Sequence, residues 1–300
     1  MNFFRMRKAR WFLIPTIFLL GSFAAAQDRI DCTAMPSKIL HRDVRYCVEI
    51  PASYDKPESK AKRYPILYML HGLGDDEQTL FKTGGWTLIE DLRKQGKIGD
   101  FLVVAPDGGR SFYINSADGK VPYSDFFLRE FMAGVEKKYR VAAGRAGRGI
   151  NGISMGGYGA LRFAFAHPEL FSSVSAQSAA LITESPTEMD AASKSGSPVV
   201  KSLLQVFGNP IDVPHWEAND PFILARKNAP ALRHMAIYFN CGRNDDYGFE
   251  KGASALDAEL TKLHVPHEYH EYPGGHSLQY FLAHLMETIE FHSRAWGLSK

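Results

Sequence analysis

The stretch Gly152-Ile153-Ser154-Met155-Gly156 constrains what this chain can fold into more than any other part of it. An apolar-leaning run over residues 149–153 predicts a buried strand, and the apolar spacing after Ser154 predicts a helix. A serine between two glycines, where a strand turns sharply into a helix, is typical of a nucleophile elbow. The glycines leave room for the tight turn, so the serine points outward. Ser154 is therefore the candidate nucleophile; a glycine-rich turn that merely ends a strand is the alternative.

From residue 65 onward, predicted strands alternate with predicted helices, and most of these strands are apolar throughout. Such strands are typical of a parallel sheet that is covered on both faces. We therefore expect one α/β domain over residues 27–300, with a mostly parallel central sheet and helices on both faces. The expected strands span residues 38–42, 44–50, 65–70, 101–105, 149–153, 172–175, 235–241 and 267–272. Helices are expected over 86–94, 124–140, 252–263 and 276–296, after Ser154, and from residue 220. Residues 181–215 are predicted to form a partly helical insertion over the active site.

The first 26 residues differ from the rest of the chain. Basic residues gather at positions 5–10, an apolar run follows over 11–20, and small residues end the segment at 22–26. This pattern predicts a secretory signal peptide that is cleaved before Gln27, because the apolar run is shorter than the about 20 residues of a membrane span. An uncleaved anchor is the alternative. We expect an exported protein, periplasmic or extracellular, with no stable membrane insertion after cleavage.

Removal of this segment brings the charge close to neutral. The full chain has 35 Lys and Arg against 33 Asp and Glu, and cleavage takes away four basic residues and no acidic ones. A near-neutral chain lacks the basic surface that holds nucleic acid or an anionic membrane. We expect neither as a partner.

The chain has three cysteines, Cys32, Cys47 and Cys241. An exported protein meets an oxidising environment, in which Cys32 and Cys47 can form a disulfide. A hairpin turn at residues 42–43 would instead place Cys47 opposite Lys38, so the sequence leaves this pairing open. Cys241 is expected to be a small buried residue at a strand end.

A serine hydroxyl needs a general base, and the base needs an acid that orients it. After a nucleophile elbow these partners follow the serine in the order acid, then histidine. Asp245 follows the predicted strand 235–241, and His276 follows the strand 267–272 within a Gly-Gly loop. Functional groups of open α/β sheets gather at such strand ends. Asp245 and His276 are therefore the candidates, with Asp246 as the alternative acid.

The tetrahedral oxyanion of such a reaction needs two N–H donors. Met155 supplies one, and Leu73 supplies the other from a loop at residues 71–74 whose glycines let the backbone approach closely. His71 precedes the elbow and is expected to hold this loop in place.

Other residues of interest lie outside these motifs. Tyr113, Asn115 and Tyr123 follow the predicted strand 101–105 and are candidates for lining the substrate pocket, with ordinary loop surface as the alternative. Histidines 264, 267 and 270 are scattered over a helix end and an alternating strand, so we expect no metal site.

The chain resembles the Putative esterase family of α/β-hydrolases. This family includes esterase D-type S-formylglutathione hydrolases, feruloyl and acetyl-xylan esterases, enterochelin esterases and secreted mycolyltransferases. The resemblance covers about residues 37–290 and rests on the elbow and on the motifs at 70–74, 241–245 and 274–276, with further matches at 37–40, 48–51 and 54–55. It implies an α/β-hydrolase fold, in which Ser154, Asp245 and His276 match the catalytic triad, and Leu73 and Met155 match the oxyanion donors.

Two features depart from individual members of the family. S-formylglutathione hydrolases are cytosolic, whereas this chain carries a predicted export signal. Feruloyl esterases often have a tryptophan close behind the catalytic histidine, whereas Leu278 and Tyr280 follow His276 here.

These features predict an exported serine esterase that acts on a small-molecule or carbohydrate-linked ester, such as a feruloyl or acetyl ester, without metal or cofactor. An acyltransferase of the mycolyltransferase type or an S-formylglutathione hydrolase-like thioesterase would use the same residues. A non-catalytic binding protein on the same fold is the alternative from another class, and it would carry a broken triad.

Overall fold

The computed structural model describes residue 1 and residues 28–192 and 198–299. The predicted signal peptide, Met1 apart, lies outside these residues. Within the described ranges, no helix has the length and apolar character that crossing a membrane requires.

The centre of the described chain is one eight-stranded sheet with the order β1-β2-β4-β3-β5-β6-β7-β8. β2 pairs antiparallel with β1 and β4, and the other pairings are parallel. The predicted mostly parallel sheet is therefore confirmed. The strands are β1 (Arg29–Ser37), β2 (Arg42–Ile50), β3 (Ile66–Leu70), β4 (Leu102–Pro106), β5 (Arg148–Ile153), β6 (Ser173–Gln177), β7 (Ala236–Gly242) and β8 (Glu268–Tyr272).

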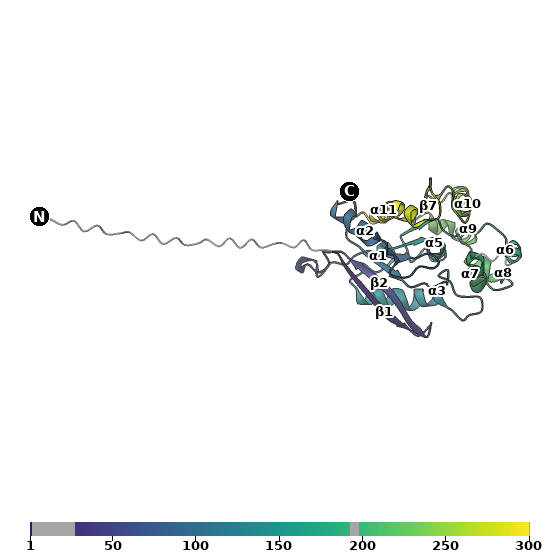
Figure 1. The fold of residues 1–300 in the computed structure, drawn as a ribbon, viewed down its shortest axis with the longest axis horizontal. Helices are drawn as coiled ribbons and strands as arrows, with labels where there is room; N and C mark the ends of the chain where they lie inside the picture. Colours follow the sequence, from purple (N-terminus) through teal and green to yellow (C-terminus); the bar gives the residue numbers. More distant parts are fainter. Residues whose placement is uncertain (2–27, 193–197, 300) are drawn as a thin grey trace.

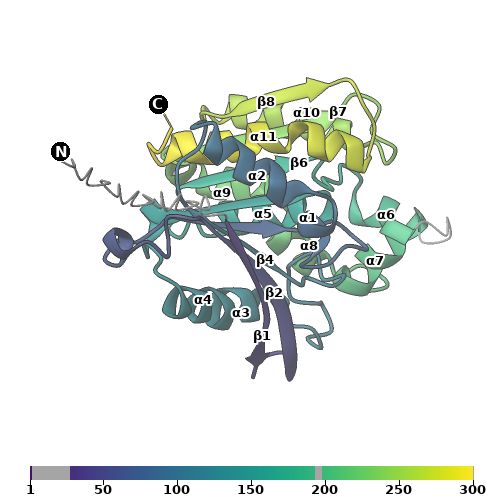
Figure 2. The ribbon, with the colours of Figure 1, turned by 60° about the vertical axis from the view of Figure 1, so that its left-hand side comes forward.

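Helices cover both faces of this sheet, as predicted. Figure 2 shows α2 and α11 lying together over one face. The α-helices are α1 (Thr79–Lys82), α2 (Gly85–Lys94), α3 (Tyr123–Phe126), α4 (Met132–Lys138), α5 (Met155–Ala166), α6 (Pro186–Ala192), α7 (Pro198–Phe207), α8 (Val213–Asn219), α9 (Pro221–Leu232), α10 (Phe249–Lys262) and α11 (Leu278–Ala295). Short turns η1 (Pro57–Ser59) and η3 (Arg145–Gly147) and the π-helical η2 (Phe127–Phe131) complete the elements. The expected helix 124–140 is present as one continuous helical run over residues 123–138, in which η2 is a π-helical turn between α3 and α4.

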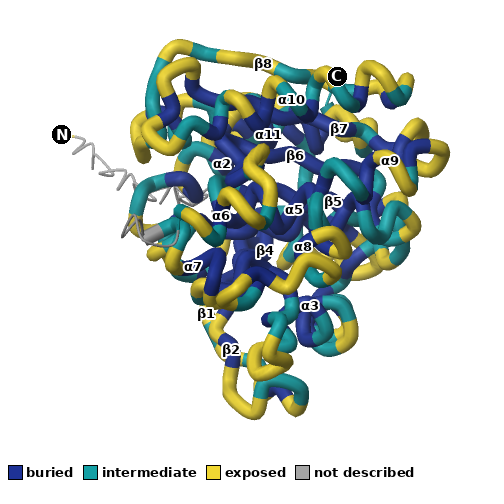
Figure 3. Tube along the Cα trace, turned by 90° about the vertical axis from the view of Figure 1, so that its right-hand side faces the viewer, coloured by how far each residue is buried: buried dark blue, intermediate teal, exposed yellow. Residues whose placement is uncertain are grey.

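Two apolar cores hold the helices against the sheet. Successive side chains of a strand point to opposite faces. Accordingly, Tyr68 of β3 belongs to the core under α4, α5, α9 and α10, whereas Met69 belongs to the core under α2 and α11. Figure 3 shows the buried centre around β4, β5 and α5. This alternation explains why the strands are apolar throughout.

The insertion predicted at residues 181–215 contains α6, α7 and the start of α8. These three helices lie together at one end of the molecule (Figure 1).

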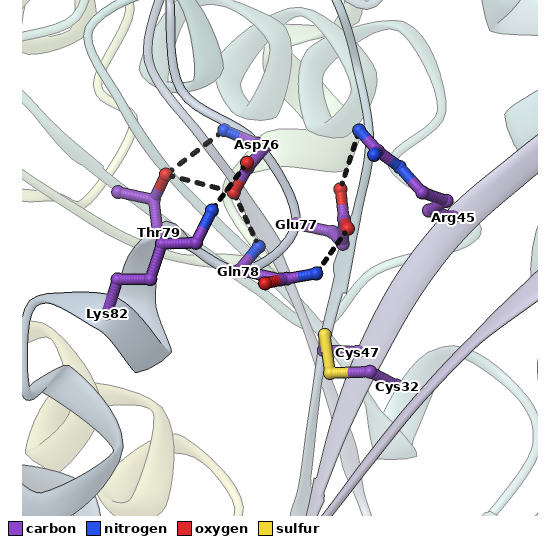
Figure 4. Close-up of a disulfide and its surroundings, with 8 residues drawn as sticks. All are labelled: Cys32, Arg45, Cys47, Asp76, Glu77, Gln78, Thr79 and Lys82. Carbon is purple, nitrogen blue, oxygen red and sulfur yellow. Dashed lines mark hydrogen bonds and ion pairs between the residues drawn. A yellow bond between two sulfur atoms is a disulfide. The ribbon is translucent and has the colours of Figure 1, made fainter.

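The first hairpin differs from its prediction. The turn lies at residues 38–41 rather than 42–43, so Cys32 stands opposite Cys47 in the register, and the two form a disulfide (Figure 4). A carboxylate from η2 fixes this turn, because Glu130 accepts hydrogen bonds from Ser37 Oγ over 2.6 Å and from the Lys38 N–H over 3.2 Å. The expected strand at 38–42 is therefore wrong, and the disulfide that the sequence left open is present.

Candidate active site

Ser154 lies between the end of β5 and the start of α5. Its φ of 57° and ψ of −117° are strained for a residue with a side chain. The positive φ is typical of the sharp turn at a nucleophile elbow, while ψ falls outside the left-handed helical region. Neighbouring backbone holds this conformation: the Ser154 N–H donates to Gln177 O over 2.9 Å, and its carbonyl accepts from the Ala180 N–H over 3.0 Å. The elbow therefore depends on β6 and on the loop that follows β6.

The two glycines of the elbow are needed because backbone approaches them closely. A Cβ atom on Gly152 would lie 2.0 Å from the Gly156 carbonyl oxygen, and one on Gly156 would lie 2.0 Å from the Leu70 carbonyl oxygen. Any side chain at either position would collide with main chain. This close packing places the start of α5 against the end of β3.

The structure brings the three predicted triad residues into one hydrogen-bonded chain. His276 Nε2 lies 2.9 Å from Ser154 Oγ, and His276 Nδ1 lies 2.7 Å from Asp245 Oδ2. Both distances are within the about 2.6–3.2 Å that such pairs need. The side chain of Asp245 is fully buried and that of His276 is 9% exposed, so little water competes for these hydrogen bonds.

Asp245 and Asp246 both contact the histidine, but at different atoms. Asp245 accepts from the ring, and its other oxygen accepts from the Tyr247 N–H over 3.0 Å. Asp246 Oδ2 accepts from the backbone N–H of His276 over 2.8 Å. Burial raises the pKa of Asp245, but the His276 ring and the N–H groups of Tyr247 and Phe249 outweigh it and leave the pKa below its ordinary value. Asp245 is therefore ionised at neutral pH.

Three aromatic rings fix the orientation of the His276 imidazole. The ring centroids of Tyr247, Phe281 and Phe249 lie 4.8, 5.0 and 5.5 Å from it, each in an edge arrangement. No sequence motif points to these three residues. Phe281 follows the histidine by five positions on α11. Tyr247 precedes α10 and Phe249 begins it, and no local pattern connects either residue to His276.

His71 ties the predicted oxyanion loop to its surroundings, as expected. Its Nε2 accepts from the Gly108 N–H over 2.8 Å, so Nδ1 carries the proton and donates to the Gly72 carbonyl over 2.8 Å. Gly72 lies against the elbow, since a Cβ there would be 3.6 Å from Ser154 Cβ. Figure 4 shows the continuation of the loop, in which the Asp76 N–H donates to Thr79 Oγ1 over 3.0 Å.

The two predicted oxyanion donors both adjoin Ser154, Met155 in the sequence and Leu73 in the cavity that Ser154 lines. Met155 is the first residue of α5, and the first N–H groups of a helix have no intrahelical acceptor. Leu73 lines the same cavity as Ser154. Both positions suit donors to a group attacked by Ser154 Oγ.

The triad opens into a cavity of about 230 Å³, here called the catalytic cavity. Ser154 and His276 line it together with Leu73, and Val199 reaches it from α7 of the insertion. A neighbouring apolar cavity of about 240 Å³ shares Gly72, Asp75, Ile153 and Phe281 with it. Leucines of α11 and α1 line much of this apolar cavity, among them Leu80, Leu278, Leu282 and Leu285. A substrate at Ser154 therefore has an apolar space beside it.

The three residues predicted to line the pocket do not face the catalytic cavity. Tyr113 and Tyr123 are fully buried, with hydroxyls that donate to His71 O over 3.1 Å and to Asp107 O over 3.0 Å. Asn115 Oδ1 accepts from the Asp125 N–H over 3.1 Å. These side chains support the loop after β4 and none of them lines the catalytic cavity, although Tyr123 lines a second cavity beside it. Arg110 is the residue of that loop that lines the catalytic cavity.

Comparison with known proteins finds similarity to esterases. The model of a family described as "Putative esterase" matches residues 37–292. Esterase Rv1288 of Mycobacterium tuberculosis is 28% identical over 239 residues, which are 74% of this chain and 50% of that protein. An acetyl esterase of Caldicellulosiruptor saccharolyticus is 23% identical over 264 residues, which are 86% of this chain and 96% of that protein. A solved structure of a ferulic acid esterase has a TM-score of 0.76 at 26% identity, with 90% of this chain and 99% of that chain covered.

The chain spans about half the length of the M. tuberculosis relative, whereas it spans nearly all of the acetyl esterase. The family match covers most of the chain and includes the elbow and the Asp245 and His276 loops. The chain therefore belongs to the Putative esterase family of α/β-hydrolases.

Proposed function

We propose that this protein is an exported carboxylesterase that cleaves its substrate through an acyl-enzyme intermediate on Ser154. The observation that carries the proposal is the hydrogen-bonded chain from Ser154 through His276 to the buried Asp245. A non-catalytic protein would have no need to hold a strained serine against a base and an acid.

The reaction has two halves. Ser154 Oγ attacks the ester carbonyl carbon while His276 Nε2 takes the hydroxyl proton, and the N–H groups of Leu73 and Met155 stabilise the oxyanion. The carbon–oxygen bond to the alcohol then breaks, and His276 gives its proton to the leaving oxygen. A water molecule, deprotonated by His276, attacks the acyl-enzyme and releases the acid and the free serine.

Asp245 serves this cycle without moving a proton itself. Its carboxylate fixes the tautomer in which Nε2 is free to accept, and it stabilises the imidazolium that forms in each half. The lowered pKa of Asp245 supports this role, because the carboxylate remains charged as long as the enzyme is at neutral pH.

A small apolar acyl group suits the space beside the triad. The apolar cavity adjoins Ser154, and its leucines would remove acyl carbon atoms from water. Relatives named acetyl esterase and ferulic acid esterase support small or aromatic acyl groups. We include carbohydrate-linked acetyl or feruloyl esters in the proposed substrate class.

Export rests on two features of the N-terminal part. The sequence pattern of residues 1–26 is that of a signal peptide. The Cys32–Cys47 disulfide is of a kind that forms and persists in oxidising compartments.

Labelling with a fluorophosphonate tests the proposed chemistry directly. The folded protein should carry one label at Ser154, located by peptide mass spectrometry, and Ser154→Ala should carry none. Ser185→Ala is a suitable control, because Ser185 is an exposed residue that caps α6 through Glu188. Unlabelled Ser154 in correctly folded protein would reject the enzyme proposal.

A further inference from the structure

A second polar cavity adjoins the catalytic one. It has a volume of about 190 Å³ and lies between the loop after β4, the start of β2 and the end of α7. Its polar lining includes Arg42, Arg110, Ser111, Ser116 and Gln205. Arg110 also lines the catalytic cavity, so the two spaces meet at this residue. We call the second space the basic cavity.

The two arginines of the basic cavity are not neutralised. Among the described residues, neither Arg42 nor Arg110 forms an ion pair. Arg45, three residues after Arg42, provides the contrast, since it contacts both Glu77 at 3.4 Å and Asp107 at 3.3 Å. Positive charge is therefore left without an acidic partner at the basic cavity, whereas Arg45, on the opposite face of β2, is paired.

Arg110 is also held in place. Its Nε donates to Ser202 Oγ over 3.3 Å, and Ser202 is a buried residue of α7. This contact uses Nε and leaves the two terminal nitrogens of the guanidinium for a ligand. A planar guanidinium binds a carboxylate or phosphate through two parallel hydrogen bonds.

We propose that the basic cavity binds a carboxylate or phosphate group of the substrate, so that the preferred esters are anionic. The inference rests on the proposed function of Ser154, because the ester would lie in the catalytic cavity while its anionic group contacts Arg110 and Arg42. The apolar cavity would then take an uncharged part of the same molecule. Arg110 and Arg42 act in binding and select the substrate; they do not take part in the chemical steps.

Matched pairs of esters test this preference. One pair varies the acyl side: mono-p-nitrophenyl glutarate against p-nitrophenyl pentanoate. The other set varies the alcohol side: 4-acetoxybenzoate and 4-acetoxyphenyl phosphate against 4-acetoxybenzamide. At least one anionic ester should exceed its neutral partner by about tenfold in kcat/KM at low salt, mainly through KM, since one charge-assisted hydrogen bond has about that effect. Added salt should reduce the preference, because both arginines are exposed.

Arginine variants connect the preference to this cavity. Arg42→Gln and Arg110→Gln should each lower the ratio of anionic to neutral kcat/KM severalfold. Arg294→Gln is the matched control and should keep the ratio, because Arg294 lies near the far end of α11, about 24 Å along the helix from Leu278. Thermal unfolding of each variant checks that the fold persists. A ratio near one for every pair, or a ratio that survives both cavity variants, would overturn the proposal.

A binding measurement separates this inference from the proposed reaction. Calorimetric titration of Ser154→Ala protein with mono-p-nitrophenyl glutarate and with p-nitrophenyl pentanoate requires no turnover. The glutarate ester or one of the anionic acetoxy esters should bind about tenfold more tightly than its neutral partner, and Arg42→Gln should remove most of that difference. If wild-type protein hydrolyses none of these esters, the proposed function fails while the titration still decides on the basic cavity. Equal binding of all anionic and neutral partners would reject the basic cavity as an anion site.

Discussion

Asp246 holds the main chain of His276: the His276 N–H donates to Asp246 Oδ2 over 2.8 Å. The adjacent Asp245 holds the imidazole of the same residue over 2.7 Å. Two consecutive carboxylates thus serve one histidine, the first by orienting its ring and the second by fixing the loop that carries it.

Asparagine substitutions should separate these two roles. Asp245→Asn should lower kcat by up to about 10⁴-fold, because an amide stabilises the wrong imidazole tautomer. Asp246→Asn keeps an oxygen acceptor for the N–H and should lower kcat by about tenfold or less. Steady-state kinetics on p-nitrophenyl acetate measures both. The opposite order of the two effects would assign the ring-orienting role to Asp246.

Removal of the nucleophile should abolish turnover and preserve the fold. Ser154→Ala is expected to lower kcat by about 10³-fold or more. Circular dichroism should be unchanged, and the variant can gain stability because Ser154 occupies a strained conformation, although alanine retains part of that strain. A variant with a tenth of the wild-type kcat would exclude Ser154 as the nucleophile.

The apolar cavity should determine the preferred acyl length. Leu278 lines this cavity and is 50% exposed, so Leu278→Trp can narrow the space without disturbing the core. We expect kcat/KM for p-nitrophenyl hexanoate to fall by about tenfold relative to that for the acetate, since several methylene groups lose their apolar contact. Met286→Trp, at a residue of α11 that is 37% exposed and does not line the cavity, is the control. An unchanged ratio in Leu278→Trp would place the acyl group elsewhere.

His292 should make the protein less stable in mild acid. It is fully buried between Ser173 Oγ, 2.7 Å from Nδ1, and Ser175 Oγ, 2.8 Å from Nε2. Burial lowers its pKa to about 3, whereas an unfolded histidine titrates near 6.5. Because the pKa is lowered in the folded state, the contribution of neutral His292 to the free energy of unfolding is complete above pH 6.5. It declines as the pH falls from 6.5 toward 3, because the unfolded chain then binds the proton.

Urea unfolding at pH 7 and pH 5 measures this effect. Between pH 6.5 and 5 the His292 contribution should fall by about 2 kcal/mol, since each pH unit corresponds to about 1.4 kcal/mol for one group. His292→Gln should be less stable at pH 7, since it alters the buried hydrogen bonds to Ser173 and Ser175, but should lose less free energy of unfolding than the wild type between the two pH values. Equal losses in both proteins would show that His292 is not the responsible group.

The Cys32–Cys47 disulfide should stabilise the fold without taking part in the reaction. It closes a loop of 15 residues, for which removal costs about 3 kcal/mol in the chain-entropy account. Cys32→Ser with Cys47→Ser should lower the free energy of unfolding by about that amount and keep kcat within a factor of about three at 25 °C. Denaturant titration and esterase assays of the same samples test both statements. A separate variant, Cys241→Ser, checks that the third cysteine makes no disulfide.

Local sequence determined the elements of this protein and the order of its candidate triad. The elbow could be predicted because a strand, a turn and a helix are local, and because Gly152 and Gly156 are required where their backbone meets other main chain at 2.0 Å. Continuous apolar strands predicted the two-sided parallel sheet, since a strand between two helical layers needs apolar residues on both faces. Asp245 and His276 could be located because parallel strands end at the same edge of a sheet.

Only the tertiary structure decided the contacts between segments that are distant in the sequence. The hairpin register depends on Glu130, some 90 residues further along the chain, whose carboxylate holds the turn at residues 38–41 and thereby sets Cys32 opposite Cys47. Tyr113 could not be distinguished from a pocket residue, because its burial results from packing against His71 and Gly159. Likewise, the uncompensated charge of Arg110 is a property of what surrounds it in space. Hydrophobic periodicity indicates which face of an element is buried. It carries no information about which distant side chain holds a turn, packs around the His276 ring or lines a cavity.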